Sequence, residues 1–490
     1  MGATAAFTIA PSSILGKSVS GQNAPSDMIN LCGIGVGCQG GGDIKGNVAT
    51  PDADGGNGYG YSVNATHDGK YGLTPKPQQR AGGGSRPAAK PFKRANVYGL
   101  CDVDSWYAEH MFKSYPNAKQ FTDWHKVMED KEIDCVLIAT PDHNHCIIAA
   151  NAMFAGKHVY VEKPMAKTIY EVRYLREVAK KTGMVTQMGN QGHNSEGTYK
   201  TIDWVNAGVI GDVKNIDMWT TAPSWRQGYI DRIAPQPIPD TLDYNLWLGP
   251  APMKPYSLGN LHFCWRGMWD YGTGTVGDFA AHILDAPIMA LNLDYPTKIQ
   301  ATSTPMNSEY FPLSQLVQYE FPVMGKKNKT IKATWTDNGL KSFRPDGLED
   351  GRAIAACTYY GSKGVMMHGT HGAAPQLVPE KPGWKEPDPK VARPKNVYED
   401  FFDAIREGKK TANNFEVSGK LTEIMLLTNV ALMAQSMNMT LEYDHEKMKI
   451  TNLPEANQFF HYEYRQGWEL PEMQKVLPVR RDNLGGWELI

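Results

Sequence analysis

Four short apolar runs, each followed by glycines or polar residues, constrain the fold of this chain more than any other feature. They have the length and the Val, Ile and Leu content of buried strands, and helical stretches such as 105–115 and 145–156 separate the later ones. Strands alternating with helices predict a doubly wound parallel sheet of the α/β class, with ligands at the carboxyl ends of the strands. The runs are MINLCGIGVGCQGGGD (28–43), ANVYGLCDVD (95–104), IDCVLIATPDHNH (133–145) and HVYVEKP (158–164).

Glycines follow the first run at the spacing of a dinucleotide-binding turn. Gly35, Gly37 and Gly40 fit the pattern G-x-G-x-x-G, in which missing side chains let a pyrophosphate approach the backbone at a helix N-terminus. A chain with 48 glycines produces this pattern by chance, so its context has to support it. The second run does so, because it ends in Asp102, an acid placed to bind the ribose hydroxyls of an adenosine.

Residues 47–94 interrupt this unit. Asp102 lies much further from Gly40 than the roughly 20 residues that usually separate the glycine turn from the ribose-binding acid. The interval is rich in Gly, Pro, Asn and Lys and has no hydrophobic periodicity, so we interpret it as an inserted surface loop. A flap over the adenosine half of the cofactor, or an oligomer contact, is the alternative.

The charge of Asp102 also indicates which dinucleotide binds. A carboxylate at this position repels the 2′-phosphate of NADP, so the sequence favours NAD. Lys93 and Arg94, at the end of the insertion, offer that phosphate positive charge and leave NADP open.

The fourth run ends in a charged pair that a proline fixes in place. Glu162 and Lys163 follow the apolar residues 159–161, and Pro164 pushes Lys163 toward an extended conformation. The lysine side chain is therefore expected to point in a defined direction. An ordinary exposed lysine in a turn is the alternative.

Asp278 and His282 stand four residues apart in GDFAAHILD. On a helix this spacing places both side chains on one face, within reach of each other. A carboxylate beside a histidine orients the ring and stabilises its charged form, as in a proton acceptor that works near neutral pH. The alternative is a capping aspartate and a partly buried histidine. Asp285, further along the same helix, is interpreted as structural.

Composition excludes several classes of protein. At 490 residues the chain is expected to form two domains. Its 50 Lys and Arg against 52 Asp and Glu give no basic excess, which argues against a nucleic-acid partner. No run approaches the roughly 20 apolar residues of a membrane span. The number of cysteines, seven, is odd, and several lie in apolar runs, so they are expected to be small buried hydrophobes and not a disulfide framework.

The first 27 residues are interpreted as the remnant of an export signal. MGATAAFTIAPSSILGKS is small and apolar, like the second half of such a signal, although no twin arginine precedes it. We expect a shortened twin-arginine (Tat) signal and a periplasmic protein. A native tail on a cytoplasmic protein is the alternative.

Six motifs occur in the order found in a known family. They are the glycine turn, ATPDHNH, EKP, GNQGHNSEG (189–197), LWLGPAP (246–252) and GTGTVGDFAAHILD (272–285). Together they resemble the glucose–fructose oxidoreductase / inositol dehydrogenase / MocA (Gfo/Idh/MocA) family, especially its exported bacterial members that act on carbohydrates. The resemblance runs from about residue 28 to the end, except for the inserted loop.

This resemblance implies an N-terminal Rossmann-type domain, 28–165, and a C-terminal α/β domain, 166–490, for substrate binding and oligomerisation. The second domain is expected to carry an open, mixed and mostly antiparallel sheet that forms a homodimer or homotetramer. By resemblance, Lys163 sits where nicotinamide and substrate meet and hydrogen-bonds the hydroxyl being oxidised. His282 is then the main base, Lys163 the polariser and relay, and Asp278 the orienting group.

Further residues are expected to bind cofactor or substrate. The spacing of Asp142, His143 and His145 in PDHNH is also that of metal ligands, but no cysteine pair or distant ligand supports a metal, and none is expected. The cofactor-binding residues beyond the glycines and Asp102 are Thr140, Pro141, Asp142, His145, Glu162 and Lys163. The substrate-binding residues are His193, Trp225, Arg226, Arg266, Trp269 and Tyr271, although aromatic residues this dense are as often part of a core.

Three functions remain open. The first is an NAD(P)-dependent oxidoreductase that acts on a hydroxyl of a sugar, polyol or glycoside with a tightly bound cofactor. The second is a redox-neutral glycoside hydrolase or lyase that oxidises, eliminates, adds water and reduces, for which His193 or Tyr271 would be the additional base. The third is a non-catalytic carbohydrate- or dinucleotide-binding protein, against which the set Lys163, Asp278 and His282 argues.

Overall fold

The computed structural model describes residues 28–53, 93–228, 234–257 and 261–490. The expected export segment and most of the expected inserted loop lie outside the described residues. Among the described helices, none is long and apolar enough to cross a bilayer. All seven cysteines are free and six are buried, which confirms that they are small hydrophobic side chains.

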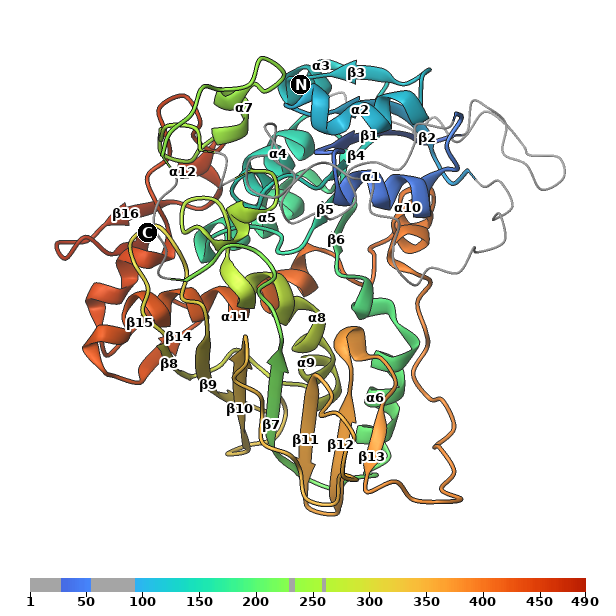
Figure 1. The fold of residues 1–490 in the computed structure, drawn as a ribbon, viewed down its shortest axis with the longest axis vertical. Coiled ribbons are helices and arrows are strands. Elements are labelled where there is room, and N and C mark those ends of the chain that lie inside the picture. Colours follow the sequence, from blue (N-terminus) through green and yellow to red (C-terminus); the bar gives the residue numbers. More distant parts are fainter. Residues whose placement is uncertain (1–27, 54–92, 229–233, 258–260) are drawn as a thin grey trace, which may run out of the picture.

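Six parallel strands build the first sheet, in the order β3-β2-β1-β4-β5-β6 (Figure 1). The order reverses between β1 and β4, so the loops that leave these strands diverge and open a crevice at their carboxyl ends. The predicted doubly wound sheet is confirmed, and the four predicted runs are β1, β2, β4 and β5. The strands are β1 (Asn30–Ile34), β2 (Asn96–Cys101), β3 (Lys119–Phe121), β4 (Cys135–Ile138), β5 (His158–Glu162) and β6 (Thr186–Gly189).

Both faces of this sheet are buried, which explains why its strands are continuously apolar. In β4, Cys135 and Leu137 belong to one core, whereas Val136 and Ile138 belong to the core on the opposite face. The helices of this part of the chain are α1 (Gln39–Asp43) with the π-helix η3 (Ile44–Val48), α2 (Ser105–Ser114), α3 (Trp124–Glu129), α4 (Asp142–Phe154) and α5 (Ile169–Thr182).

The domain boundary predicted at residue 165 is wrong, because the first sheet continues through α5 to Gly189. Strand β6 has only four residues, TQMG, and is too short and too polar to be recognised as a strand from its sequence. Helix α10 (Val397–Glu407) also returns to this domain, where Phe401 and Phe402 join the core beside β1. The dinucleotide domain is therefore built from two separate stretches of chain.

Nine strands form the second sheet, in the order β13-β12-β11-β7-β10-β9-β8-β14-β15 (Figure 1). Only β7 and β10 pair in parallel, so the mixed, mostly antiparallel sheet expected of the C-terminal domain is confirmed. The strands are β7 (Val213–Thr220), β8 (Lys298–Ser303), β9 (Gln315–Pro322), β10 (Thr330–Asp337), β11 (Cys357–Gly361), β12 (Gly364–His368), β13 (Gln376–Val378), β14 (Leu441–Asp444) and β15 (Lys449–Ile450).

Helices cover one face of the second sheet, while the other face carries polar side chains such as Asn215, Asp217 and Lys332. Helix α11 (Phe415–Met433) packs on β8 and also on α5 of the first domain, so it connects the two sheets. The other helical elements here are η4 (Gln191–Asn194), α6 (Glu196–Asn206), α7 (Tyr244–Leu248), η5 (Cys264–Gly267), η6 (Val276–Ala280), α8 (Ala281–Ile283), α9 (Asp285–Leu291), η7 (Thr370–Gly372), η8 (Gln435–Met437), η9 (Pro454–Phe460) and α12 (Met473–Val476), followed by the hairpin β16 (Val479–Arg481) and β17 (Trp487–Leu489).

A buried ion pair joins α5 to α11. Arg173 donates from Nη2 and Nε to the two carboxylate oxygens of Glu423, at 2.7 and 3.0 Å, and Tyr443 donates its hydroxyl to the same carboxylate at 2.6 Å. The Glu423 side chain has no exposed surface, so its charge depends on these partners.

We predict that Arg173→Ala destabilises the protein by about 3–5 kcal/mol, because it leaves the Glu423 carboxylate buried without its cation. Thermal or urea unfolding measures this change. Lys180→Ala on the same helix is the matched control, since Lys180 and its partner Glu177 are about half exposed and such pairs contribute at most about 1 kcal/mol. Equal stabilities of the two variants would contradict the prediction.

Candidate active site

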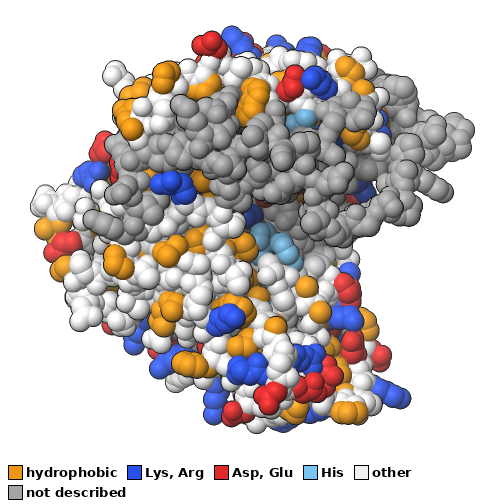
Figure 2. Space-filling model, viewed as in Figure 1, with side chains coloured by type: hydrophobic (Ala, Val, Ile, Leu, Met, Phe, Trp, Pro, Cys, Tyr) orange, Lys and Arg blue, Asp and Glu red, His pale blue; other side chains and the backbone are white. Residues whose placement is uncertain are grey.

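The catalytic candidates meet between the two sheets. Lys163 follows β5 of the first sheet, His282 lies in α8, and His371 lies in η7 between two strands of the second sheet. Together with Thr140 and Arg266 they line a cavity of about 250 Å³. Figure 2 shows histidine side chains in a recess of the molecular surface.

Lys163 is paired with an aspartate of the second domain. Its Nζ donates to Asp278 Oδ1 at 2.6 Å and to the backbone oxygen of Asp278 at 3.1 Å, and Arg266 Nε lies 3.4 Å from the same Oδ1. Burial alone would raise the pKa of Asp278, but the charges of Lys163 and Arg266 outweigh burial and hold that pKa below its usual value. The lysine side chain therefore has a defined direction, toward a carboxylate that remains charged.

Asp278 does not orient His282, which corrects the sequence prediction. The prediction assumed α-helical spacing, whereas η6 is a π-helix and only the three residues of α8 are α-helical. The π-helical turn changes the direction of Asp278 relative to His282 from that of regular α-helical spacing. Within the described part of the chain, the carboxylate of Asp278 bonds Lys163 and Arg266.

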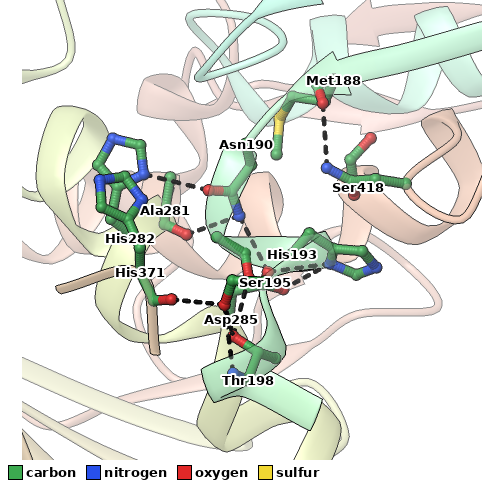
Figure 3. Close-up of polar contacts among 12 residues, drawn as sticks. Met188, Asn190, His193, Ser195, Thr198, Ala281, His282, Asp285, His371 and Ser418 are labelled. Atoms are coloured by element: carbon green, nitrogen blue, oxygen red, sulfur yellow. Dashed lines mark hydrogen bonds and ion pairs between the residues drawn. The ribbon is translucent and has the colours of Figure 1, made fainter. Parts of the chain in front are cut away.

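Asn190 orients His282 instead (Figure 3). Its Nδ2 donates to the backbone oxygen of Ala281 at 2.8 Å and to Asp285 Oδ2 at 2.9 Å. Both partners are acceptors, so the amide is fixed with its Oδ1 toward His282 Nδ1, 3.1 Å away. Because Oδ1 can only accept, Nδ1 carries the proton of the neutral imidazole and Nε2 keeps its lone pair.

The surroundings keep His282 uncharged. Burial is the main reason why the pKa of His282 lies well below its usual value, and the neighbouring Lys163 and His371 act in the same direction. A neutral imidazole with a free lone pair at a cavity is a proton acceptor. The geometry is compatible with the main-base role predicted for His282, which stays a prediction.

His193 lies behind the cavity and not in it. Its Nδ1 is 2.9 and 3.1 Å from the two carboxylate oxygens of Asp285, and the residue is 3% exposed. Burial disfavours its charged form, but the Asp285 carboxylate outweighs burial and raises the pKa of His193. The ion pair engages His193 away from the cavity and holds Asp285 in place for Asn190, and the expected substrate contact of His193 stays a prediction.

His371 is a cavity residue that the sequence did not reveal. It stands in the turn GTHG after β12, a stretch without helical or strand periodicity. Its ring centroid lies 4.1 Å from that of His282. Only the pairing of the second sheet brings it there. Asn190 is a second site residue that was not predicted. It belongs to the motif GNQGHNSEG, and that motif was the signal from which its role could have been predicted.

A second, narrower cavity of about 90 Å³ runs over the reversal point of the first sheet. Gly35, Gly37, Asp102, Thr140 and Pro141 line it, as expected of cofactor-binding residues. The two cavities adjoin, because five residues line both of them: Gln39, Ala139, Thr140, Trp265 and Arg266. A groove thus leads from the glycine turn to Lys163.

The glycine turn is built for close approach of backbone groups. Gly35 has φ +81°, and a Cβ there would lie 2.8 Å from the backbone of Ala139 and Thr140. A Cβ on Gly40 would lie 2.5 Å from the backbone oxygen of Gly35. The hydroxyl of Thr140 is buried and has no hydrogen-bond partner among the described residues, so it is available to a ligand in the groove. These residues fit a dinucleotide.

The adenosine side of the groove is more crowded. Asp102 accepts from the backbone N–H of Gly37 and of Asp104 at 2.9 and 3.0 Å, and burial raises the pKa of Asp102 to about 6. The ring of Tyr107 fills the space beside Gly37 and stacks on His262 with centroids 3.9 Å apart. A bound adenosine therefore has to share this end of the groove with the Tyr107–His262 stack.

The residues of PDHNH mainly hold loops together. His145 places its ring nitrogens 2.7 and 2.8 Å from the backbone oxygens of Pro164 and Thr140, and so ties the lysine turn to the neighbouring loop. His143 contacts backbone oxygens of the second domain. Asp142 accepts from Thr273 at 2.6 Å, and burial raises its pKa to about 7. In the described part of the chain, no three His, Cys, Asp or Glu side chains are grouped as metal ligands.

Glu162 belongs to a buried acid pair. It lines the cavity beside Lys163 and accepts from Gln191 at 3.3 Å. Asp43 lies beside it and accepts from Tyr398 at 2.7 Å. Burial raises the pKa of Asp43 to about 7 and that of Glu162 well above its usual value, so the pair does not carry two charges at neutral pH.

Most of the aromatic residues expected to bind sugar are engaged in packing. Trp225 is buried and donates to Gln227, Trp269 stacks on Phe311, and Tyr271 has no exposed surface. None of these three lines the cavity, nor does Arg226, whose backbone packs against Gly267. Among the six predicted substrate residues, Arg266 alone lines it, together with its neighbour Trp265. The other five do not line this cavity, and their expected sugar contacts stay predictions.

Two family models match the chain. One, described as "Oxidoreductase family, C-terminal alpha/beta domain", matches residues 200–321 and 347–470. The other, described as "Oxidoreductase family, NAD-binding Rossmann fold", matches residues 82–190. Both belong to the Gfo/Idh/MocA group that the sequence motifs resemble.

Curated relatives and solved structures agree with these models. Inositol 2-dehydrogenase of Salmonella typhimurium is 27% identical over 128 residues, which are 26% of this chain and 38% of that protein. Levoglucosan dehydrogenase of Pseudarthrobacter phenanthrenivorans is 26% identical over 165 residues, 34% of each chain. The matches thus span little more than a third of these relatives. The structure of an NAD-binding protein from Listeria innocua has a TM-score of 0.53 at 16% identity and covers 84% of this chain and 96% of that one, which shows a shared fold.

We predict that His282 is neutral and carries its proton on Nδ1 at about pH 6, just below the ordinary histidine pKa of about 6.5. The reasons are its lowered pKa and the fixed oxygen of Asn190. Nitrogen-15 NMR of histidine-labelled protein measures both properties, with His282→Gln to assign the signal. A charged ring, or a proton on Nε2, would contradict the inferred contact. Asn190→Ala should release the tautomer preference without charging the ring.

Proposed function

This chain belongs to the Gfo/Idh/MocA oxidoreductase family, and on that premise we propose that it oxidises a hydroxyl group of a sugar, polyol or glycoside with a tightly bound NAD. The observation that supports this most directly is the cavity at the end of the dinucleotide groove, where Lys163 and the neutral His282 lie together. The relatives named above act, by their names, on inositol and levoglucosan. Both are ring compounds that carry several hydroxyl groups.

Each polar residue of the cavity has a distinct task in this proposal. When bound, the nicotinamide supplies the hydride acceptor. His282 accepts the hydroxyl proton at Nε2, and Lys163 donates a hydrogen bond that stabilises the developing negative charge on the substrate oxygen. Asp278 fixes the lysine through the 2.6 Å ion pair. Asn190 and Asp285 fix the tautomer of the base.

NAD is preferred to NADP in this proposal. Asp102 places a carboxyl group at the end of β2, the position at which a carboxylate repels the 2′-phosphate of NADP. In the sequence, Arg94 offers positive charge to the 2′-phosphate of NADP. In the structure, its Nη2 lies 2.7 Å from Glu399 Oε1, so this charge is already paired. Lys93 is exposed.

The redox-neutral hydrolase is the second candidate, and it is less well supported. It needs a base besides His282, and the two expected candidates do not line the cavity: His193 is paired with Asp285, and Tyr271 lies in the core. A purely binding protein has no use for a fixed tautomer and a lysine held beside it.

Retention of the cofactor follows from the expected export of the protein. We propose that residues 1–27 direct it to the periplasm, where free NAD is scarce, so the dinucleotide has to travel bound. Trp265 and Arg266 line both cavities, so a dinucleotide that extends from one cavity to the other would contact them in each, which supports slow release. The open polar face of the second sheet is the proposed contact of a homodimer or homotetramer.

We predict that the purified protein retains dinucleotide through gel filtration with none added. Acid release from the desalted protein, followed by mass spectrometry, identifies the cofactor and distinguishes NAD from NADP. Protein that emerges empty and consumes added NAD⁺ one for one with product would overturn the tight binding, while leaving the oxidoreductase in place.

We predict that Lys163→Met lowers turnover by at least about 10²-fold while the dinucleotide stays bound, because the lysine contacts the reacting oxygen and not the adenosine end. A panel of myo-inositol, levoglucosan and methyl β-D-glucopyranoside, assayed by reduction of the bound cofactor and by product analysis, measures this loss. Lys167→Met is the matched control, from the same turn but outside the residues that line the cavity. Wild-type turnover of Lys163→Met would remove the lysine from the reaction.

A further inference from the structure

We propose that His371 is a specificity-determining residue that donates a hydrogen bond to the hydroxyl next to the one being oxidised, so that the cavity selects vicinal diols. This inference rests on the proposed oxidation and specifies its substrate class. It assigns a role to a residue that the mechanism above leaves unused.

His371 is held in an unfavourable backbone conformation. Its φ of 64° and ψ of 25° lie in the left-handed region, which residues other than glycine rarely occupy. Such a conformation persists only where the surroundings determine it, and it is concentrated at functional sites. A contact from outside the turn holds this conformation, because the Ser195 hydroxyl donates a hydrogen bond to the His371 carbonyl at 2.7 Å.

Close packing against two glycines keeps the turn in place. A Cβ on Gly192 would lie 2.9 Å from the Cα of His371, so only glycine allows η4 to approach this closely. A Cβ on Gly197 would collide with the backbone oxygen of Gly372. The His371 ring is therefore delivered to the cavity by contacts between three chain segments, η4, α6 and η7.

The two edges of the His371 ring have different surroundings. Nδ1 is buried on the side of Gly192 and has no hydrogen-bond partner among the described residues. His371 lines the cavity, and because its Nδ1 is buried against Gly192 we infer that the Nε2 edge faces the cavity. A buried N–H without an acceptor is rarer than a buried lone pair without a donor, so the neutral ring carries its proton on Nε2.

The same side chain is neutral for physical reasons that also apply to His282. Burial lowers the pKa of His371, and the charge of Lys163 lowers it further. His371 therefore presents an N–H donor to the cavity, while His282 presents a lone pair because Asn190 holds the proton of that ring on Nδ1. The ring centroids are 4.1 Å apart and the ring planes are inclined by 49°.

A donor and an acceptor this close match two neighbouring hydroxyl groups. The hydroxyl to be oxidised donates its proton to His282 Nε2, and the oxygen of the adjacent hydroxyl accepts from His371 Nε2–H. A monodeoxy analogue leaves the His371 N–H without an acceptor inside the closed site. The penalty for such an unpaired donor corresponds to roughly 10- to 100-fold in kcat/KM.

The test combines enzyme variants with substrate analogues. Whichever of myo-inositol, levoglucosan and methyl β-D-glucopyranoside is oxidised is compared with its monodeoxy analogues at the carbons that flank the oxidised one. Wild type should prefer the full diol over one of these analogues by roughly 10- to 100-fold. His371→Gly, which tolerates the left-handed backbone, should abolish this preference by slowing the diol and not the analogue. His371→Asn, which also tolerates that backbone and keeps an N–H donor, should restore part of it.

Controls separate this inference from the proposed function. His125→Ala, a surface histidine of α3, should behave as wild type, and retained dinucleotide with an unchanged melting temperature shows that His371→Gly is folded. Equal rates for the diol and every analogue in wild type, or an undiminished preference in His371→Gly, would overturn the role of His371. Oxidation of no panel member would instead overturn the proposed function itself.

Discussion

The ion pair between Lys163 and Asp278 is the interaction on which the site depends. It joins the carboxyl end of a strand in the first sheet to the π-helix that precedes α8 in the second domain, at 2.6 Å, with both side chains largely buried. Loss of Asp278 would leave Lys163 and Arg266 without their carboxylate in a place with little water, which is more costly than loss of an exposed pair. The pair therefore fixes the position of the lysine and the relation between the two domains at the same point.

The charge of that lysine also determines the state of its neighbours. His282 and His371 are both kept neutral by burial, and Lys163 reinforces the effect on each of them. On the other side of the lysine, Glu162 and Asp43 form a pair that burial prevents from carrying two charges at neutral pH. The Asp278 carboxylate thus pairs with two cations, Lys163 and Arg266, and the two histidines beside them are neutral hydrogen-bonding groups.

Hydrogen-bond direction gives these neutral groups their specificity. The amide of Asn190 is fixed by two acceptors, Ala281 and Asp285, and this determines which nitrogen of the neutral His282 ring keeps its lone pair. Asp285 is in turn held by the buried His193. A chain of buried contacts, none of them at the reacting atom, therefore sets the chemistry at the cavity.

The sequence by itself determined the parts that depend on local geometry. A buried parallel strand has to be continuously apolar, and a tight turn at positive φ requires glycine, as at Gly35. Pro164 restricts the conformation of the lysine before it. Each of these signals lies within a few residues of the structure that it determines. Tertiary structure decided the rest. The Asp278–His282 spacing does not reveal that the Asp278 carboxylate pairs with Lys163 and Arg266, which come from distant parts of the fold and the chain. His371 and α10 reach their places only through sheet pairing and core burial across more than a hundred residues. Such contacts leave no periodic trace in the sequence, because the free energy that forms them comes from partners that are distant along the chain.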